Sequence, residues 1–507
     1  MGYVEDNGLS KLADGSLVVE SSAVRRQKRL SGHDSKPNER DHRTESEKDR
    51  GRVSYSPFLR RLAGVTQVVS PNLRSSHLHT RESHSQKVAL VAREIAEDIV
   101  RRADSEKGLA ETIAAFGGLN ITACETAGLA HDLGHPPFGH AGEVVLNRVL
   151  RGKGVVDGFE GNAQSFRIVT KLDRRKLSDV NGLDLTNVTL AAILKYPRLC
   201  PNEWLVNNKH SSEASEKPPK FGAYTSEANL FEGVMASAIH PEGGRDRQTL
   251  EASVMDLADD ITYAIHDLED FYKEGIIDFV QVDNDIDEAL EFLKKQSIDD
   301  VSQNEPNAFL VFGKEVAHSA GSFFHTELYT GKLYETKMMI TKGGLKQRYT
   351  GTQVQLARAL STFSLTIEEL LGDVRVTTEP PWENGPSVYL GREGWHLIQC
   401  LKTVTRRYVV ATSSMGIVER SQQKMVEKLF GNLAKWVESS PRLRELPQPL
   451  SGYLRDVDPE GLRVSKHVTP AHYRAISDYI CSLSDEGCSS RSQWLRGSEV
   501  PILSTAR

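Results

Sequence analysis

The chain has little of what would mark a membrane protein or a disulfide-stabilised secreted protein. In its 507 residues no stretch approaches the ~18 apolar residues that a membrane-spanning helix needs. The five cysteines are scattered, odd in number and without a CxxC pair, which argues against a disulfide framework and against a thiolate zinc site. We therefore interpret the cysteines as packing residues of a soluble protein.

A strong excess of charge of one sign is also missing. The formal net charge is -6, with 63 Lys and Arg against 69 Asp and Glu, so the chain is not a strongly basic body that binds polyanions over its whole surface. The start, MGYVEDNGLS, has neither a basic segment followed by an apolar core nor an acylation motif. We expect a cytoplasmic protein without a membrane partner, which holds any anionic ligand in a local cluster.

Two polar segments interrupt the ordered sequence. Residues 1–48 end in a mixed-charge run without helical or strand periodicity, which predicts a disordered charged tail. The basic cluster RRQKR at 25–29 is interpreted as a solvated charge run rather than a nucleic-acid contact. Residues 201–220 predict a surface loop insertion, because they are polar and lie between two ordered segments.

Elsewhere the apolar residues recur at helical spacing, and strand signals are few. One apolar helix is expected to begin at the N-cap Thr186 and to stop before Pro197. Further helices are predicted at 285–295, 353–371, 392–410 and 417–437. The predicted fold class is therefore all-α.

The densest chemical signal is AGLAHDLGHPPFGHAGE at 127–143. It brings His131, His135 and His140, three of the chain's 16 histidines, close together. Helical spacing aims His131 inward from the end of a helix, with Asp132 beside it. An imidazole next to a carboxylate suits a divalent cation. Because two ligands seldom suffice, the remaining ligands must come from elsewhere in the chain.

Two other helical segments offer such ligands. His84 lies in HTRESHS at the start of one predicted helix, and Asp259 and Asp260 lie together in EASVMDLADDITYAIHDLED. Spacing favours Asp259, because Asp259, Tyr263 and Asp267 share one helix face at steps of four. Asp260 leads instead to positions that point into a core.

These segments resemble those of a known family, the HD-domain dGTPase-like dNTP triphosphohydrolases. The similarity runs in order through DRGRVSYSPFLRRL, TQVV, TRESHS, HDLGHPPFGHAGE, GFEGNAQSFRIV, LTNVTLAAILKYP and LADDITYAIHDLED. The resemblance implies an HD-type catalytic domain at 49–300 and a helical C-terminal region at 301–507 that completes the fold. It also implies metal-dependent hydrolysis of a dNTP to deoxynucleoside and tripolyphosphate, by attack of water at the α-phosphorus.

Carried over position by position, the resemblance implies a metal site made of His84, His131, Asp132 and Asp259, in which Asp132 also counts as a catalytic residue. One divalent ion is implied per site. A ligand set of two histidines and two carboxylates admits Mn, Fe, Co, Ni or Mg.

The resemblance further implies catalytic and substrate-binding residues. His140, oriented by Glu143, corresponds to the acid/base pair, and a histidine suits this role because its unperturbed pKa of ~6.5 lies near working pH. The implied substrate contacts are to the phosphates by Arg81, His135, Lys195 and Tyr196, and to the sugar by Gln67, Tyr263 and Asp267. Some relatives carry a histidine where this chain has Gly161, so the approach of a further imidazole to the α-phosphate stays open.

Two alternative functions stay open at this point. One is another HD phosphohydrolase, such as a phosphodiesterase or nucleotidase, although two-metal members need extra histidines and His210 and His240 lie in no recognisable motif. The other is a nucleotide- or nucleic-acid-binding regulator with an inactive HD site, against which the intact His140 and Glu143 argue. The resemblance implies a homo-oligomer, commonly a hexamer. Base preference, and activation by a dNTP or single-stranded DNA effector, stay open as well.

Overall fold

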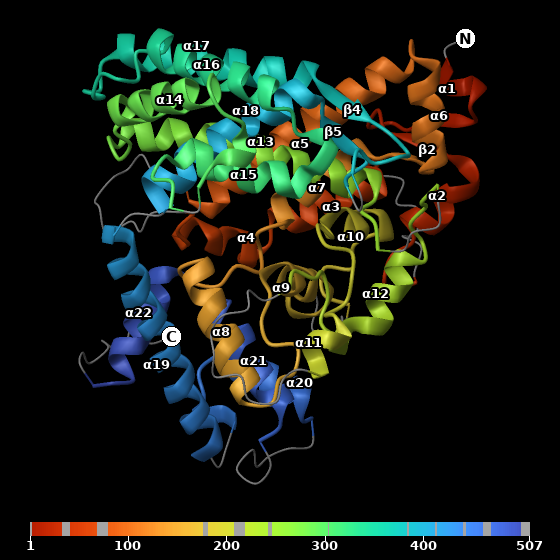
Figure 1. Cartoon of the computed structure of the whole chain (residues 1–507). Coiled ribbons are helices and arrows are strands. Elements are labelled where there is room, and N and C mark those ends of the chain that lie inside the picture. The colour runs from red at the N-terminus through yellow and green to blue at the C-terminus, as the bar shows by residue number, and fades with distance from the viewer. Residues whose placement is uncertain are drawn as a thin grey trace.

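The structure is a computed structural model, and it describes most of the chain. The described residues are 3–32, 41–67, 80–175, 181–206, 219–241, 246–302, 304–382, 385–410, 413–439, 443–459 and 468–497. The fold is all-α, as predicted, with two very small sheets (Figure 1). In this part of the chain no helix has the length and apolar character needed to cross a membrane.

Both sheets are short and antiparallel. The first has the order β1-β2-β3 and consists of Leu9–Lys11, Leu17–Val19 and Gly118–Leu119. Its register pairs Leu9 with Val19 and Leu17 with Leu119. The second sheet pairs β4 (Val374–Val376) with β5 (Val388–Leu390).

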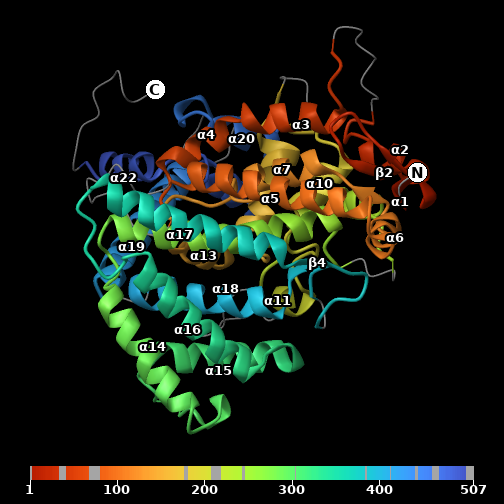
Figure 2. The same cartoon turned by 90° about the horizontal axis from the view of Figure 1, so that it is seen from above.

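Three helices form the centre of the molecule and carry or adjoin the predicted metal ligands His84, His131 and Asp259. They are α5 (Arg81–Ala103), α7 (Ile121–Ala130) and α13 (Leu250–Lys273), and α5 packs against both others. Each begins at a side-chain cap, provided by Thr80, Asn120 and Thr249 respectively, which satisfies backbone N–H groups that the first turn leaves free. Figure 2 shows α17 (Gln353–Gly372) lying over α13, and α18 (Arg392–Thr405) to one side of it; both helices contact α13.

A glycine lets α5 and α7 approach closely. A Cβ atom at Gly128 of α7 would lie 2.6 Å from the Cα atom of Ala89 on α5, a distance that no side chain tolerates. The close approach brings the start of α5, with His84, beside the end of α7, where His131 is the C-cap.

The remaining helices surround this centre. They are α1 (Tyr3–Asp6), α2 (Glu20–Gln27), α3 (Glu45–Ser54), α4 (Pro57–Arg61), α6 (Lys107–Ala115), α8 (His140–Gly152), α9 (Gly161–Arg167), α10 (Asn187–Ile193), α11 (Asn202–Val206), α12 (Ala228–Met235), α14 (Phe279–Leu293), α15 (Ala308–Ala320), α16 (Thr326–Lys342), α19 (Ser413–Ser439), α20 (Leu450–Val457), α21 (Pro470–Ile480) and α22 (Asp485–Trp494). The four helices predicted after residue 280 are confirmed as α14, α17, α18 and α19. The Thr186 cap is confirmed too, but α10 ends at Ile193, before Pro197, because Leu194 already leaves the helical conformation.

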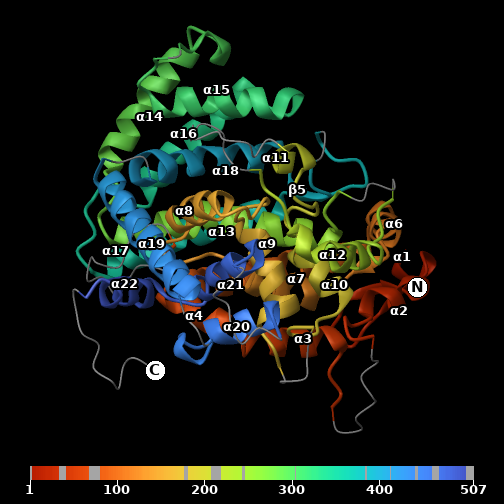
Figure 3. The same ribbon diagram turned by 90° about the horizontal axis from the view of Figure 1, so that it is seen from below.

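Three main apolar clusters make up the core. The largest joins α5, α6 and α13 to α14–α18, so the core continues without a break across residue 300. A second packs α7 and α10 against α3, α4 and α12. The third is built from α8 and α19–α22, which Figure 3 shows together on the lower side of the molecule. All five cysteines are buried and none forms a disulfide, as predicted.

The prediction of a disordered tail at 1–48 is wrong for the part that the structure describes. Residues 3–32 contain two helices and two strands, and Val4, Leu9 and Leu17 belong to the main core. Arg26 forms a buried ion pair with Glu251. The elements are too short to show periodicity, and charges that looked solvated are partners of buried carboxylates. Residues 33–40 lie outside the described residues.

The predicted loop insertion at 201–220 can be compared with the structure only at its ends. Residues 202–206 form the short helix α11, whereas 207–218 lie outside the described residues. Residues 219–220 belong to the ordered chain, and Lys220 contacts residues of the candidate site.

Candidate active site

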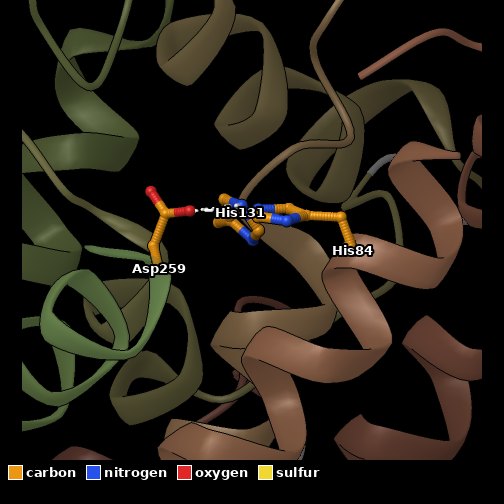
Figure 4. Close-up of side chains that lie close together, drawn as sticks. All are labelled: His84, His131 and Asp259. Carbon is orange, nitrogen blue, oxygen red and sulfur yellow. Dashed lines mark hydrogen bonds and ion pairs between the residues drawn. The ribbon is translucent and has the colours of Figure 1, made fainter. Parts of the chain in front are cut away.

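Two imidazoles and one carboxylate converge where α5, α7 and α13 meet. Ligand atoms of His84, His131 and Asp259 all lie within 4.8 Å of one another (Figure 4). His84 Nε2 lies 3.1 Å and His131 Nε2 3.6 Å from the same atom, Asp259 Oδ1. His84 is 2% exposed and His131 6% exposed, so both rings are shielded from bulk water. Such a mixed nitrogen and oxygen set suits a divalent transition metal or magnesium.

The ring of His131 is held with one nitrogen facing this cluster. Its Nδ1 lies 2.8 Å from the carbonyl oxygen of Gly128, and a carbonyl only accepts, so Nδ1 carries the proton in the neutral ring. His131 Nε2 is then an acceptor, buried and without a hydrogen-bond partner among the described residues. A buried nitrogen lone pair beside a carboxylate is what a metal ion would satisfy. The residues therefore fit the implied metal.

Asp132 lies at the edge of this group. Its Oδ1 is 3.4 Å from His131 Nε2 and 3.1 Å from His135 Nδ1, and its Oδ2 accepts a hydrogen bond of 2.6 Å from Arg81. Burial raises the pKa of Asp132, but the charges of His135, His131 and Arg81 more than offset this and hold the pKa well below its ordinary value. Asp132 is therefore an ionised carboxylate that links the first cluster to His135.

Asp259 and Asp260 have different surroundings. Asp259 Oδ2 accepts a bond of 2.8 Å from Lys195, which also lies 2.7 Å from Asp256. Asp260 forms an ion pair of 2.8 Å with Lys402, and its side chain is 46% exposed. Of the two adjacent carboxylates, only Asp259 shares the cluster with the histidines.

A second cluster lies next to the first and contains His135, His140 and Glu143. His140 Nδ1 lies 2.9 Å from Glu143 Oε2, and His135 Nε2 lies 3.6 Å from Glu143 Oε1. The His140 side chain is 75% exposed, whereas the Glu143 side chain is 11% exposed. Burial raises the pKa of Glu143, but His135, His140 and Lys220 together hold it below its ordinary value. The pair is an accessible imidazole oriented by a buried, ionised carboxylate.

Gly161 packs directly against this pair. A Cβ atom at Gly161 would lie 2.2 Å from Glu143 Oε1 and 3.7 Å from His135 Cε1. No side chain fits at this position while Glu143 stays where it is. The further imidazole that the family resemblance leaves open therefore has no counterpart at Gly161, and His135 is the imidazole nearest to that point among those described.

Two of the three residues expected to bind the sugar, Tyr263 and Asp267, lie along α13 beside Asp259. Burial raises the pKa of Tyr263 to about 12, and the neighbouring Asp267 and Asp259 add to this effect. Burial also raises the pKa of Asp267 to about 6. The three side chains are therefore close neighbours, as their steps of four predict. Gln67 Oε1 is buried and has no hydrogen-bond partner in the described part of the chain.

The residues expected to bind phosphate have different surroundings from one another. Arg81 is 3% exposed, and its guanidinium bonds to Asp132, to Thr66 O at 3.1 Å and to Gln67 O at 3.4 Å. The guanidinium group of Arg81 therefore bonds to protein oxygens in this structure. Lys195 contacts Asp259, and burial raises the pKa of Tyr196 beside it.

Sequence reasoning missed three polar residues of this region, Lys220, Asp256 and Gln248. Lys220 Nζ lies 2.9 Å from Glu160 Oε1 and 3.8 Å from Glu143 Oε2. Gln248 donates 2.8 Å to Asp256, which contacts Lys195. Asp256 had a usable signal, since it precedes Asp259 by three positions on one helix. Lys220 had none, because it ends the polar insertion.

Comparison with known proteins identifies the class. The family model of the HD domain matches residues 81–264, a segment that begins with α5, ends within α13 and contains both clusters. The central segment of the chain is therefore similar to the HD domain of phosphohydrolases.

The similarity to individual proteins extends well beyond this segment. Two proteins named deoxyguanosinetriphosphate triphosphohydrolase-like are each 29% identical to this chain. The match extends over 483 residues for the protein from Shewanella oneidensis and over 475 residues for the one from Shewanella woodyi. These matches cover 91% and 90% of this chain, and 94% and 92% of the two relatives. The similarity to these proteins therefore extends over nearly the whole chain, from the HD-domain segment into the C-terminal helices.

Proposed function

We propose that this protein hydrolyses deoxynucleoside triphosphates to deoxynucleoside and tripolyphosphate, with one divalent metal ion per site. The observation that carries the proposal is the position of the His84, His131 and Asp259 cluster directly beside the His140 and Glu143 pair. The names of the relatives and the HD-domain match support the same substrate class.

The metal would be held by His84, His131 and Asp259, with Asp132 completing the set. When bound, a divalent ion supplies a Lewis acid that polarises the phosphoryl oxygens. Asp132 and Asp259 are suited to this because both pKa values lie well below the ordinary value: burial raises them, and neighbouring cationic groups more than offset it. Both carboxylates are therefore ionised over the whole neutral range.

His140 would act as the general acid. Cleavage between the α-phosphorus and the 5'-oxygen releases a sugar alkoxide, which leaves poorly at neutral pH unless it is protonated. The His140 ring is accessible, and its Nδ1 contacts Glu143 at 2.9 Å, so the ring direction is fixed. Glu143 is ionised, because His135, His140 and Lys220 hold its pKa below its ordinary value.

The substrate would be placed by charges and by one aromatic ring. Lys195 and Lys220 bring two ammonium groups to the two clusters, where they offset the charge of a triphosphate. Tyr263 and Asp267 would receive the deoxyribose. A ring packed against the 2' carbon excludes a ribose hydroxyl, so ribonucleotides should be poor substrates.

The resemblance also implies further properties, which we include in the proposal. These are a homo-oligomer, commonly a hexamer, a cytoplasmic location, and Mn, Fe, Co, Ni or Mg as the metal. Activation by a second dNTP or by single-stranded DNA would change the rate of hydrolysis at this active site.

A substrate panel tests the proposed function. Metal-stripped protein is supplied with each metal in turn and given all dNTPs and rNTPs, singly and mixed, together with a phosphodiester. The proposal is supported if the wild-type protein consumes dNTP only in the presence of metal and the Asp259→Asn variant consumes none. Turnover of the phosphodiester alone would assign another HD phosphohydrolase activity. A nucleotide that binds and is recovered unchanged would indicate a regulator.

A further inference from the structure

A carboxylate from the C-terminal helices reaches the loop that precedes His140. Asp485, the first residue of α22, is 7% exposed. Its Oδ1 accepts a hydrogen bond of 2.7 Å from the backbone N–H of Phe138. Its Oδ2 accepts bonds of 3.0 Å and 2.6 Å from the N–H and the hydroxyl of Thr66. One buried side chain therefore joins two separate loops of the catalytic domain.

The loop held by Asp485 has an unusual backbone. Phe138 has a φ of 64° and Gly139 a φ of 54°, and a bulky residue rarely adopts a positive φ. His140 follows at once as the first residue of α8. The direction in which the His140 side chain leaves the helix start therefore depends on this two-residue turn, and Asp485 bonds to its first N–H group.

The bonds to Thr66 lead toward the metal cluster. The carbonyl oxygen of Thr66 accepts a bond of 3.1 Å from Arg81, whose guanidinium donates 2.6 Å to Asp132. Asp485 thus connects through Thr66 and Arg81 to a proposed ligand, and through Phe138 to the proposed acid.

A second contact holds the same helix turn against the same loop. Arg61 donates 3.0 Å to the carbonyl oxygen of Leu483, and also bonds the carbonyl oxygens of Leu133 and His135. Burial lowers the pKa of Arg61 to about 10, so it stays a cation that faces Asp485 at neutral pH. The turn between α21 and α22 therefore does not depend on Asp485 alone for its place. This separates the effect of the carboxylate on the loop from the effect of the helix on the fold.

We propose that Asp485 is a positioning residue for His140, acting through the backbone of Phe138 and Gly139. This inference rests on the proposed function, because it assigns to Asp485 the alignment of the group that protonates the leaving oxygen. It gives the C-terminal region a specific part in catalysis that neither spacing nor family resemblance assigned.

Asp485→Asn is the informative substitution, because it preserves size and removes one of the two acceptor oxygens. Glu486→Gln is the matched control, since Glu486 is the next residue in the first turn of α22 and is exposed. Both changes remove one negative charge from the same helix start, but only Asp485 contacts Phe138. Asp485→Glu keeps both oxygens and serves if the asparagine variant does not fold.

Two measurements decide the proposal. The first is amide hydrogen exchange over residues 133–141, which needs no substrate. We expect faster exchange in Asp485→Asn, a smaller change in Asp485→Glu and none in Glu486→Gln. Unchanged exchange in a folded Asp485→Asn protein would overturn the proposal. If the wild-type protein hydrolyses no dNTP, the proposed function fails while this measurement still shows whether Asp485 holds the loop.

The second measurement is a double-mutant cycle on kcat. Asp485→Asn should lower kcat by on the order of 100-fold, the loss typical of a misplaced catalytic group, with bound metal retained and KM little changed. In the His140→Ala background the same substitution should add little, because the group it positions is gone. An equal further loss of kcat in that background would overturn the proposal, since Asp485 would then act by another route.

Discussion

Lys195 and Asp259 form a direct ion pair, with 2.8 Å between Lys195 Nζ and Asp259 Oδ2. The other oxygen of Asp259 lies 3.1 Å from His84 Nε2. The carboxylate therefore directs one oxygen to the histidine cluster and the other to a half-buried cation. This arrangement makes the two neighbours Asp259 and Asp260 experimentally separable.

Asp259→Asn should lose bound metal and activity together, because it removes the charge of a ligand from a buried site. Asp260→Asn should keep both, since Asp260 pairs with Lys402 at the surface. Metal content after dialysis, activity and helical circular dichroism are measured on both variants. If the metal is lost from Asp260→Asn and kept by Asp259→Asn, the ligand role belongs to Asp260.

Lys195→Met should weaken metal binding without abolishing it. Lys195 orients a proposed ligand from outside the cluster, and loss of such a partner typically costs about 10–100-fold in metal affinity. Lys402→Met, which breaks the equivalent pair with Asp260, is the control and should bind metal as the wild type does. Equal affinities in the wild type and Lys195→Met would show that Lys195 does not orient Asp259.

Metal affinity should rise with pH through the neutral range. Burial lowers the pKa of His84, but the hydrogen bond and charge of Asp259 more than offset it, so the pKa lies above the ordinary 6.5. A histidine must be neutral to bind a metal, so binding below this pKa displaces about one proton. Calorimetry in buffers of different ionisation enthalpy measures the released proton. Affinity that is constant from about pH 6 to pH 8 would contradict this account.

The N-terminal segment should contribute to stability. Arg26→Ala leaves Glu251, which is 1% exposed, without its partner. Breaking a buried pair in this way costs about 3–5 kcal/mol in the free energy of unfolding. Arg25→Ala, at an exposed neighbouring position, should change it by less than about 0.5 kcal/mol. Urea unfolding of the two variants compares them, and equal stabilities would mean that the pair with Glu251 contributes nothing.

Local signals in the sequence were enough to predict the main helices. Thr186 caps α10 as expected, since a cap and the first apolar turn lie within a few residues of each other. The end of α10 at Ile193 was not predictable from Pro197, because the chain already leaves the helical conformation at Leu194, before proline forbids it. The convergence of His84, His131 and Asp259 came from family resemblance and not from spacing.

Contacts between distant segments could not be predicted. Lys220 approaches Glu160 from a segment that reads as a surface loop. Asp485 bonds to Phe138 across a separation of 347 residues. The prediction of a disordered tail at 1–48 was wrong for the same reason. From the sequence alone its arginines look solvated, because the sequence does not show their buried partners. A hydrophobic pattern reports which face of an element is buried, but not which polar group it meets.

The identity of the products tests the central claim most directly. The metal-loaded protein is given the dNTP it consumes in water enriched in oxygen-18, and the products are separated and analysed by mass spectrometry. If water attacks the α-phosphorus and His140 protonates the 5'-oxygen, deoxynucleoside and tripolyphosphate form in equal amounts, with the label in the tripolyphosphate. A deoxynucleoside monophosphate with pyrophosphate, or label in the nucleoside, would contradict the account.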